Sequence, residues 1–395
     1  MTKTYQDYFD ALGFKESSSV SGGAQNYGSE NPFGYIGKYQ FGEAALFDLG
    51  YYGIDNSDSN LFRNDWSGNW SGKNGINSKQ DYFNNGAVQE LIIRDWHDIL
   101  WGRIKFLELD KYEGQILNDN PITISGMLAA AHLIGAGSTS SDTAGLKGYL
   151  LSGAVFSPAD GNGTTANTFM NFFEGFQTPF IADHDKAELI AGGTGKDVLI
   201  GFAGNDTLIG NGDTDTAIYR GRFADYDIHH NADQNWTIIH KNSGVDGTDT
   251  LNQIERIQYT DISLALDLDG KAGITAKTLG AVFGQVSLSN EIYSGIGLNL
   301  LDNGMSYEAL MQFAINAALG DNATNHTAVV NLLYRNVVGF APSAADEAYY
   351  VGLLDSGIHS VASIGVMAAD TALNGENINL VGLSQTGLEY VLTSV

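Results

Sequence analysis

The sequence predicts a multidomain α+β protein: a mostly helical first region, a parallel β-roll with an antiparallel cap, and a second helical region. Three observations lead to this fold class. Apolar residues follow helical spacing before residue 177, glycine- and aspartate-rich units repeat every nine residues near the middle, and helical stripes return after residue 268. We therefore expect domains at residues 1–177, 182–268 and 269–395, which a chain of 395 residues can accommodate.

The composition excludes several classes of partner. The formal charge is −26, from 46 acidic and 20 basic residues, whereas a nucleic-acid-binding surface needs a basic footprint. The same charge disfavours anionic membrane surfaces. No apolar run reaches the roughly 18 residues of a membrane span. The chain has no cysteine, which excludes disulfides and thiolate metal sites.

The first region alternates predicted helices with long polar loops. Apolar residues show helical spacing at residues 5–12, 40–49, 88–107 and 124–134. Glycine-, asparagine- and serine-rich loops lie between them at residues 17–32, 55–74 and 138–142. Long polar loops are uncommon in a helical domain without a purpose, and a binding groove is one such purpose.

The middle region repeats a nine-residue unit made of a glycine turn, an acid and a short apolar strand. Asp197, Asp206 and Asp215 hold the same place in successive units, and Leu199 and Leu208 form the predicted inner ladder. Aspartate supplies the hard oxygen that calcium prefers, and one carboxylate per turn needs a cation between turns. The pattern predicts calcium as cofactor and an element that folds only when calcium is present. The glycines, expected at positive φ, are Gly192, Gly193, Gly195, Gly201, Gly204 and Gly210.

This nonapeptide pattern resembles the calcium-binding repeats of RTX proteins. The resemblance implies that ligands come from turns two repeats apart, which pairs Asp197 with Asp215. A degenerate unit at residues 183–191 carries Glu188 in the aspartate phase. Asp206 is therefore expected to find its partner in Glu188 or in the segment after residue 217.

The RTX resemblance also implies a location. Such proteins leave Gram-negative bacteria unfolded through a type I secretion channel, with an uncleaved C-terminal signal, and fold outside where calcium is abundant. The first twenty residues lack the apolar core of a cleavable signal, and residues 388–395 are compatible with a C-terminal one. We therefore expect an extracellular or cell-surface protein whose partners include the type I secretion machinery.

Strand patterns and then helical stripes follow the repeats. Residues 226–228 and 236–240 read as antiparallel strands, and residues 247–251 and 254–259 resemble the sheet that closes RTX repeat blocks. Residues 332–357 resemble a small helical domain of unknown function found beside RTX repeats, for which we expect a structural or adhesive role. Predicted helices in this last region lie at residues 310–319, 328–337, 346–354 and 361–373.

Three short motifs follow one another in the first region. Glu16 is followed by serine where the first helix should end, the element Gly37–Gln40 comes next, and a buried alanine-rich helix ends in Gly-x-Gly at residues 135–137. This order resembles the lysozyme-like superfamily, in particular lytic transglycosylases and phage tail lysozymes. The resemblance implies that Glu16 is the catalytic acid and that Tyr39 and Gln40 contact the sugar near the cleavage point.

The chemistry of glycoside cleavage is compatible with this assignment. A carboxyl that stays protonated near neutral pH can donate its proton to the leaving group, and an apolar setting raises its pKa. We expect Glu16 to lie beside Phe14 and near the aromatic residues Tyr35, Tyr39 and Phe41. The second group is either the substrate's own acetamido oxygen or another carboxylate. Glu43 and Glu30 are the candidates for that carboxylate.

The remaining candidate contacts leave alternatives open. His132-Leu133 stands where transglycosylases usually have tyrosine and asparagine, which makes plain hydrolysis more plausible than formation of an anhydro sugar. His132 could bind substrate or be a core residue. Trp66 and Trp70 could stack on sugar rings or anchor their polar loop.

The predicted function is a secreted lysozyme-like glycosidase or lytic transglycosylase. Its expected substrate is peptidoglycan or a related amino-sugar polysaccharide, including exopolysaccharide or chitin-like chains. The chain has no His-Glu-x-x-His zinc helix and no Gly-x-Ser-x-Gly elbow, which disfavours RTX metalloproteases and lipases. The alternative is a non-enzymatic, calcium-dependent surface or adhesion protein that binds glycan without cutting it.

Overall fold

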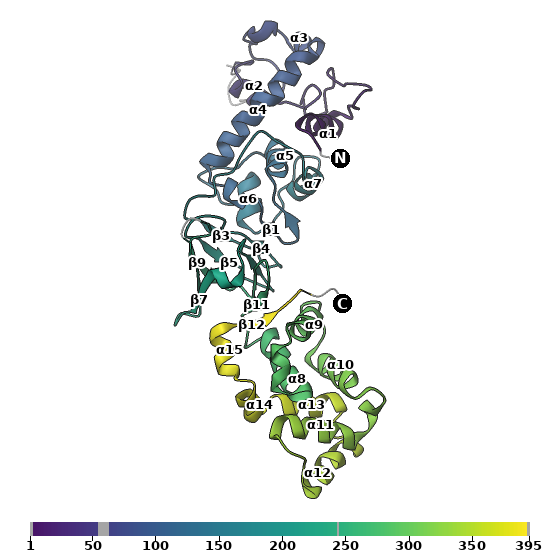
Figure 1. Cartoon of the computed structure of the whole chain (residues 1–395). Coiled ribbons are helices and arrows are strands. Elements are labelled where there is room, and N and C mark those ends of the chain that lie inside the picture. Colours follow the sequence, from purple (N-terminus) through teal and green to yellow (C-terminus); the bar gives the residue numbers. More distant parts are fainter. Residues whose placement is uncertain (1–2, 54–62, 243–244, 393–395) are drawn as a thin grey trace. The chain divides into compact units, whose positions relative to one another are not determined.

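The computed structural model describes residues 3–53, 63–242 and 245–392 (Figure 1). The chain forms two compact units, Met1–Asp183 and His184–Val395. The first unit is mainly helical, whereas the second combines a β-roll with helices, so the α+β class is confirmed.

The described residues of the first unit form seven α-helices packed around an apolar core. Its central helix, α5, is buried from Ser125 to Ala131 and contacts α6 and α7. The predicted helical segments match α1, α2, α4 and α5, whereas α3, α6 and α7 were not anticipated. The elements are α1 (Tyr5–Ser17), α2 (Glu43–Asp48), α3 (Lys79–Asn84), α4 (Gly86–Phe106), α5 (Ile124–Ile134), α6 (Gly145–Leu151), α7 (Ala166–Phe172), and a hairpin of β1 (Ile116–Leu117) and β2 (Asn120–Pro121).

Local chemistry fixes both ends of α1, the helix that carries Glu16. Thr4 and Asp7 form a reciprocal capping box at its start, with the Asp7 N–H donating to Thr4 Oγ1 at 3.1 Å. Ser18 ends the helix in the left-handed conformation, with φ of 60°. Tyr8, Phe9 and Leu12 are fully buried, as the helical spacing predicts. Glu16 consequently lies in the last turn.

The repeats of the second unit form a parallel β-roll in which each layer contains two nine-residue repeats. β3 (Leu189–Ala191) pairs with β5 (Thr207–Ile209), and β4 (Val198–Leu199) pairs with β6 (Thr216–Ile218), so each strand meets the one 18 residues later. The alternation places successive strands in two different sheets. One inward residue per strand is fully buried: Ile190, Leu199, Leu208 and Ala217.

Two later strands extend this parallel roll. β9 (Thr248–Asn252) pairs in parallel with β5, and β10 (Arg256–Gln258) pairs in parallel with β6. The expectation that residues 247–259 belong to an antiparallel cap is therefore wrong in part. Antiparallel pairing begins one strand further out, in β7 (Tyr226–His230), β8 (Trp236–His240), β11 (Ser263–Ala265) and β12 (Leu388–Tyr390).

Helices complete the second unit around a core centred on Met311, Ile315, Val329 and Ile364. The four helices predicted after residue 269 are present. However, the segment 361–373 breaks at Asp370, where Thr371 caps a new helix through the Asn374 N–H. The elements are α8 (Lys271–Phe283), α9 (Glu291–Asp302), α10 (Tyr307–Leu319), α11 (His326–Val338), α12 (Ala344–Asp355), α13 (Val361–Ala369), α14 (Ala372–Asn377) and α15 (Leu380–Thr386).

The predicted division at residue 268 lies inside this second unit. β12, close to the end of the chain, returns to pair with β11 beside the roll. Arg256 of β10 is only 2 % exposed and forms ion pairs with Asp267 at 2.5 Å and with Asp302 of α9 at 2.9 Å. Lys271 at the start of α8 also reaches Asp302, at 3.2 Å. These contacts join the roll to the helices that follow it.

We predict that Arg256→Ala lowers the free energy of unfolding by about 3–5 kcal/mol, because it leaves buried carboxylates without their cation. Denaturant unfolding of the full chain in calcium measures this change. Arg222→Ala is the matched control, since Arg222 pairs with Asp261 at the surface and its loss should have a much smaller effect. Equal effects of the two substitutions would contradict the role given to Arg256.

Candidate functional site

A polar cleft of about 360 Å³ opens in the first unit, where the motif-bearing segments meet. Glu16 comes from the end of α1, Tyr35 and Gln40 from the following loop, and His132 from α5. The order of motifs in the sequence therefore corresponds to one place in the fold. The full lining is Glu16, Asn31, Phe33, Tyr35, Gln40, Arg63, Asn64, His132, Leu133, Asp160, Gly161 and Asn162.

Glu16 has the environment of a carboxyl that holds its proton. Its Oε1 atom is buried and has no hydrogen-bond partner among the described residues. Burial, and next the negative charge of Asp160, raise the pKa of Glu16 from 4.5 to about 8. Glu16 is thus mostly protonated at neutral pH, as a general acid requires.

The aromatic surroundings of Glu16 differ from the expectation. Phe14 is 52 % exposed, whereas Tyr39 and Phe41 are core residues. Tyr39 donates its hydroxyl hydrogen bond to Glu90 at 2.7 Å, away from the cleft lining. Tyr39 therefore does not contact a ligand in this cleft through its ring. Of the expected aromatic neighbours, Tyr35 faces the cleft, and Phe33 joins it.

The second carboxyl in the cleft is Asp160. Its Oδ1 atom accepts the N–H groups of Asn162 at 2.9 Å and Thr164 at 2.7 Å, which fixes a turn of the loop before α7. The sequence Asp-Gly-Asn-Gly at residues 160–163 signals such a turn. The turn signal alone says nothing of a cleft, because α1 lies more than 140 residues earlier in the chain.

Neither carboxylate proposed from the sequence as the second acid lines this cleft. Glu43 is 1 % exposed and accepts the Trp66 N–H and, at 3.3 Å, the Tyr52 hydroxyl. Glu43 thereby holds the loop at residues 64–66 in place, a positioning role. Glu30 forms an ion pair with Lys79 at 3.0 Å.

His132 and Gln40 line the cleft, and each side chain makes a hydrogen bond to a backbone carbonyl. His132 Nε2–H donates to the Tyr39 carbonyl at 3.0 Å, and burial lowers the pKa of His132 to about 4. The ring is therefore neutral, and its buried Nδ1 has no hydrogen-bond partner within the described part of the chain. Gln40 adopts a left-handed φ of 48° and donates through Nε2 to the Gly37 carbonyl at 2.8 Å.

Trp66 and Trp70 stack on each other, with ring centroids 5.5 Å apart. Both rings also contact Tyr52 edge-on, at 5.3 Å. The Trp66 indole N–H donates to the Gly34 carbonyl at 2.8 Å. Of the two roles left open, the structure favours loop anchoring, because the two rings pack on each other and on Tyr52 and the Trp66 N–H is already bonded.

The acids of the β-roll form two columns linked by hydrogen bonds. In one column the Asp197 N–H donates to Asp215 Oδ1 at 2.8 Å, so these two residues lie in adjacent layers, and their pairing as calcium ligands stays a prediction. In the other the Glu188 N–H donates to Asp206 Oδ1 at 2.8 Å. Each carboxylate thus accepts the backbone N–H of the acid one layer earlier.

Two further acids continue these columns and were missed from the sequence. The Asp206 N–H donates to Asp249 at 2.9 Å, and the Asp215 N–H donates to Glu255 at 2.9 Å. Asp206 therefore lies between Glu188 and Asp249, the two places from which a partner ligand was expected, and joint ligation with either stays a prediction. The overlooked signal was the near-identity of Gly-Asn-Asp-Thr-Leu at residues 204–208 and Gly-Thr-Asp-Thr-Leu at residues 247–251.

The carboxylates of the columns have the properties of a cation site. Asp206 Oδ2 and Asp215 Oδ2 are buried and, among the described residues, have no hydrogen-bond donor. Burial raises the pKa of Asp206 to about 6 and that of Asp215 to about 8. An uncompensated buried charge of this kind is stabilised by a cation. Calcium, which prefers carboxylate and carbonyl oxygen, would supply the neutralising charge.

The donor set also constrains how an ion could be held. No group of three or more His, Cys, Asp or Glu residues within the described ranges is arranged to hold a metal. An ion would therefore combine one or two carboxylates with backbone carbonyl oxygens of the turns. This combination of ligands is typical of calcium.

The repeat glycines are needed for space more than for positive φ. A Cβ at Gly192, Gly201 or Gly210 would lie 2.2, 2.6 or 2.4 Å from the carboxylate oxygen of the aspartate five residues later. These three are outside the positive-φ region, where Gly204 lies with φ of 140°. The expectation of positive φ throughout is thus wrong. Gly193 donates its N–H to Asp197 at 2.6 Å, and Gly195 lies in the bend before it.

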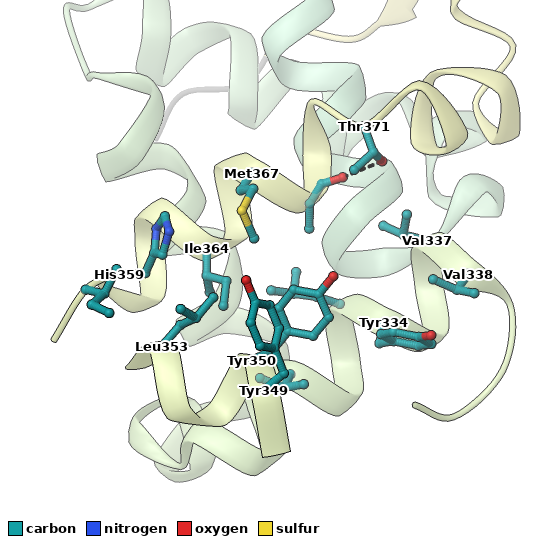
Figure 2. Close-up of a pocket in the computed structure, with 14 residues that line it drawn as sticks. Tyr334, Val337, Val338, Tyr349, Tyr350, Leu353, His359, Ile364, Met367 and Thr371 are labelled. Atoms are coloured by element: carbon teal, nitrogen blue, oxygen red, sulfur yellow. Dashed lines mark hydrogen bonds between the residues drawn. The ribbon is translucent and has the colours of Figure 1, made fainter. Parts of the chain in front are cut away.

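A separate cavity of about 520 Å³ lies among α11, α12 and α13 (Figure 2). Its wall is mostly apolar, with Leu353, Ile364 and Met367 beside the rings of Tyr349 and Tyr350. The sequence analysis did not anticipate it. Polar atoms at its edge are engaged locally: the Tyr334 hydroxyl donates to Asp346 at 3.2 Å.

Comparison with known proteins identifies one part of the chain. Residues 185–217 match the family model of the RTX calcium-binding nonapeptide repeat in four copies. No curated protein matches the chain. Across the described residues, no helix combines the length and apolar character needed to cross a membrane. The RTX prediction is confirmed for the repeats, and the lysozyme-like resemblance stays a prediction.

We predict that chelating calcium from the purified chain destabilises the β-roll, because neighbouring acids of one column, such as Asp197, Asp215 and Glu255, then repel without a counter-ion. Circular dichroism and thermal unfolding, with and without a calcium chelator, measure the effect. Magnesium added back at the same concentration is the control, since it fits such a site poorly. An identical spectrum and melting temperature in both conditions would argue against bound calcium.

Proposed function

We propose that the chain is a secreted, calcium-stabilised enzyme that cleaves glycosidic bonds, with Glu16 as the general acid. The observation that carries the proposal is the state of Glu16: a carboxyl that lines the cleft, with its pKa raised to about 8 and with a buried Oε1 atom that has no hydrogen-bond partner among the described residues. A poor alkoxide leaving group needs a proton, and a neutral carboxyl can supply it.

The proposed reaction begins with transfer of the Glu16 proton to the bridging oxygen as the bond to the anomeric carbon breaks. Positive charge develops on the sugar ring, and the Asp160 carboxylate or the substrate's acetamido oxygen stabilises it. Water then adds to the anomeric carbon and returns a proton to Glu16. Asp160 replaces Glu43 and Glu30 as the candidate second carboxylate because it lines the same cleft as Glu16.

The polar character of the cleft supports a sugar substrate. Side-chain amides of Asn31, Gln40, Asn64 and Asn162 line it, and amides can donate to and accept from hydroxyl and acetamido groups. Arg63 adds a positive charge suited to substrates that carry carboxylates. We therefore propose peptidoglycan or a related amino-sugar polysaccharide. The tryptophan pair takes no part in this version of the site.

The repeats support the proposed location. RTX repeats are associated with type I secretion, and calcium is plentiful outside cells. We propose that the chain is exported by this machinery and acts in the extracellular medium or at the cell surface.

The alternative is a calcium-dependent surface protein that binds glycan in the same cleft without cutting it. The family match supports the calcium-binding part of this alternative, because it covers the calcium-binding repeats at residues 185–217. Both versions use the same polar lining, so only a product assay separates them.

We predict that Glu16→Gln reduces release of sugar ends from purified peptidoglycan by about 10²–10⁴-fold, because the amide cannot donate the proton. Binding to the insoluble polymer should persist, since the cleft keeps its shape. Glu174→Gln, at an exposed position, is the matched control and should keep full activity. Full activity of Glu16→Gln would refute the catalytic role. Binding by the wild type without release of ends would favour the alternative.

We predict a pH effect on stability that identifies the buried acid. The folded-state pKa of Glu16, about 8, lies above its ordinary 4.5, so the folded chain binds the extra proton. Glu16 therefore costs nothing well below pH 4.5 and destabilises the fold progressively as pH rises through 8. Glu16→Gln should accordingly raise the melting temperature more at pH 8.5 than at pH 5, with calcium present. The same gain in Glu174→Gln, or none in Glu16→Gln, would contradict this.

A further inference from the structure

The acid columns of the roll do not stop where the recognised repeats stop. The family match ends at residue 217, whereas Asp249 and Glu255 occupy the next layer of the two columns. Between residues 218 and 248 the chain makes the β7–β8 hairpin and then returns. The period of nine is therefore broken in sequence but continues in space.

The returning strands rejoin the roll in the same register as the repeats. Leu251 pairs with Leu208 and Ile257 pairs with Ala217, so the inward apolar residues stay aligned. Leu251 and Ile257 are buried like those of the repeats. The acids stay aligned too, because Asp249 precedes Leu251 by two residues and Glu255 precedes Ile257 by two. Asp206 and Leu208 have the same spacing.

Two buried carboxylate oxygens lie in these last layers. Asp206 is 1 % exposed and Asp215 is 0 % exposed, and the Oδ2 atom of each is buried with no hydrogen-bond partner among the residues the structure describes. Each of these residues donates its own N–H to the added acid, Asp249 or Glu255. Asp249 is also 1 % exposed, so it adds a second buried carboxylate to its layer.

Backbone carbonyl groups of the turns lie close to the same layers. A Cβ at Gly210 would lie 2.0 Å from the Gln253 carbonyl oxygen, and one at Gly247 would lie 1.5 Å from the Gly204 carbonyl oxygen. Turns from the repeats and from the returning segment are therefore in direct contact. Carboxylate and carbonyl oxygens together are a calcium-type ligand set.

We propose that Asp249 and Glu255 are calcium ligands outside the nonapeptide repeats, closing sites in the layers of Asp206 and Asp215. The inference extends the calcium binding proposed for the repeats and is independent of cleavage by Glu16. It has a consequence for the rest of the unit. Arg256, which follows Glu255, pairs with Asp267 and Asp302, so an ion in this layer stabilises the strand that holds α9.

The competing account is that the two side chains only cap backbone N–H groups. Asp249→Asn and Glu255→Gln separate the two accounts, because an amide oxygen still accepts the N–H bond but has lost the charge that calcium needs. Asp269→Asn is the matched control: Asp269 is exposed and lies on the chain just beyond the roll. All variants are made in the full chain.

Calcium titration calorimetry, together with metal analysis of gel-filtered protein, gives the result. We expect each of Asp249→Asn and Glu255→Gln to lose a calcium ion or to bind it roughly tenfold more weakly. Asp269→Asn should match the wild type. Wild-type calcium number and affinity in both test variants would overturn the proposal.

Hydrogen exchange of the wild-type chain tests the proposal without any variant, so it still decides if a variant does not fold. Calcium should increase protection of residues 248–258 together with residues 185–217. Protection that rises in the repeats alone would overturn the proposal. A lack of response in both segments would overturn it together with calcium binding by the repeats. Neither result bears on glycan cleavage, which the Glu16 variants test separately.

Discussion

Burial of carboxylate oxygens without a hydrogen-bond donor is the constraint on which both halves of this protein depend. Glu16 in the first unit and Asp206 and Asp215 in the second each have an oxygen removed from water with no donor among the described residues. Such a group must either keep its proton or acquire a positive partner. The cleft is suited to the first outcome, with one neutral acid in a polar setting. The roll is suited to the second, because its acids stack in columns.

Arg256 shows how the chain treats a similar problem with its own side chain. Its guanidinium is buried between Asp267 and Asp302, where it neutralises acids that would otherwise repel. The acids of the two columns are instead linked to one another by backbone N–H groups. Divalent ions suit that place, and the −26 charge of the chain is compatible with an environment rich in them.

The sequence allowed prediction of features that repeat or that are local. The nine-residue period led to the strands, the inward leucines and the Asp197–Asp215 pair, and helical spacing led to α1, α4 and α5. Asp160 could not be found, since its turn signal does not reveal that it faces Glu16. Glu43 was misjudged because its burial depends on Tyr52 and Trp66, which only the tertiary fold brings together. Asp249 and Glu255 escaped because the hairpin interrupts the period.

The hydrogen-bonded columns also bear on how the roll responds to its surroundings. Asp206 and Asp215 each take part in two layers, accepting from the layer before and donating to the layer after. An ion that orders one carboxylate thereby prepares the neighbouring layer, as in other stacked structures with nearest-neighbour coupling. Assembly along such a stack is cooperative. The roll would consequently change from a loose to a rigid state cooperatively, over a narrow range of ion concentration.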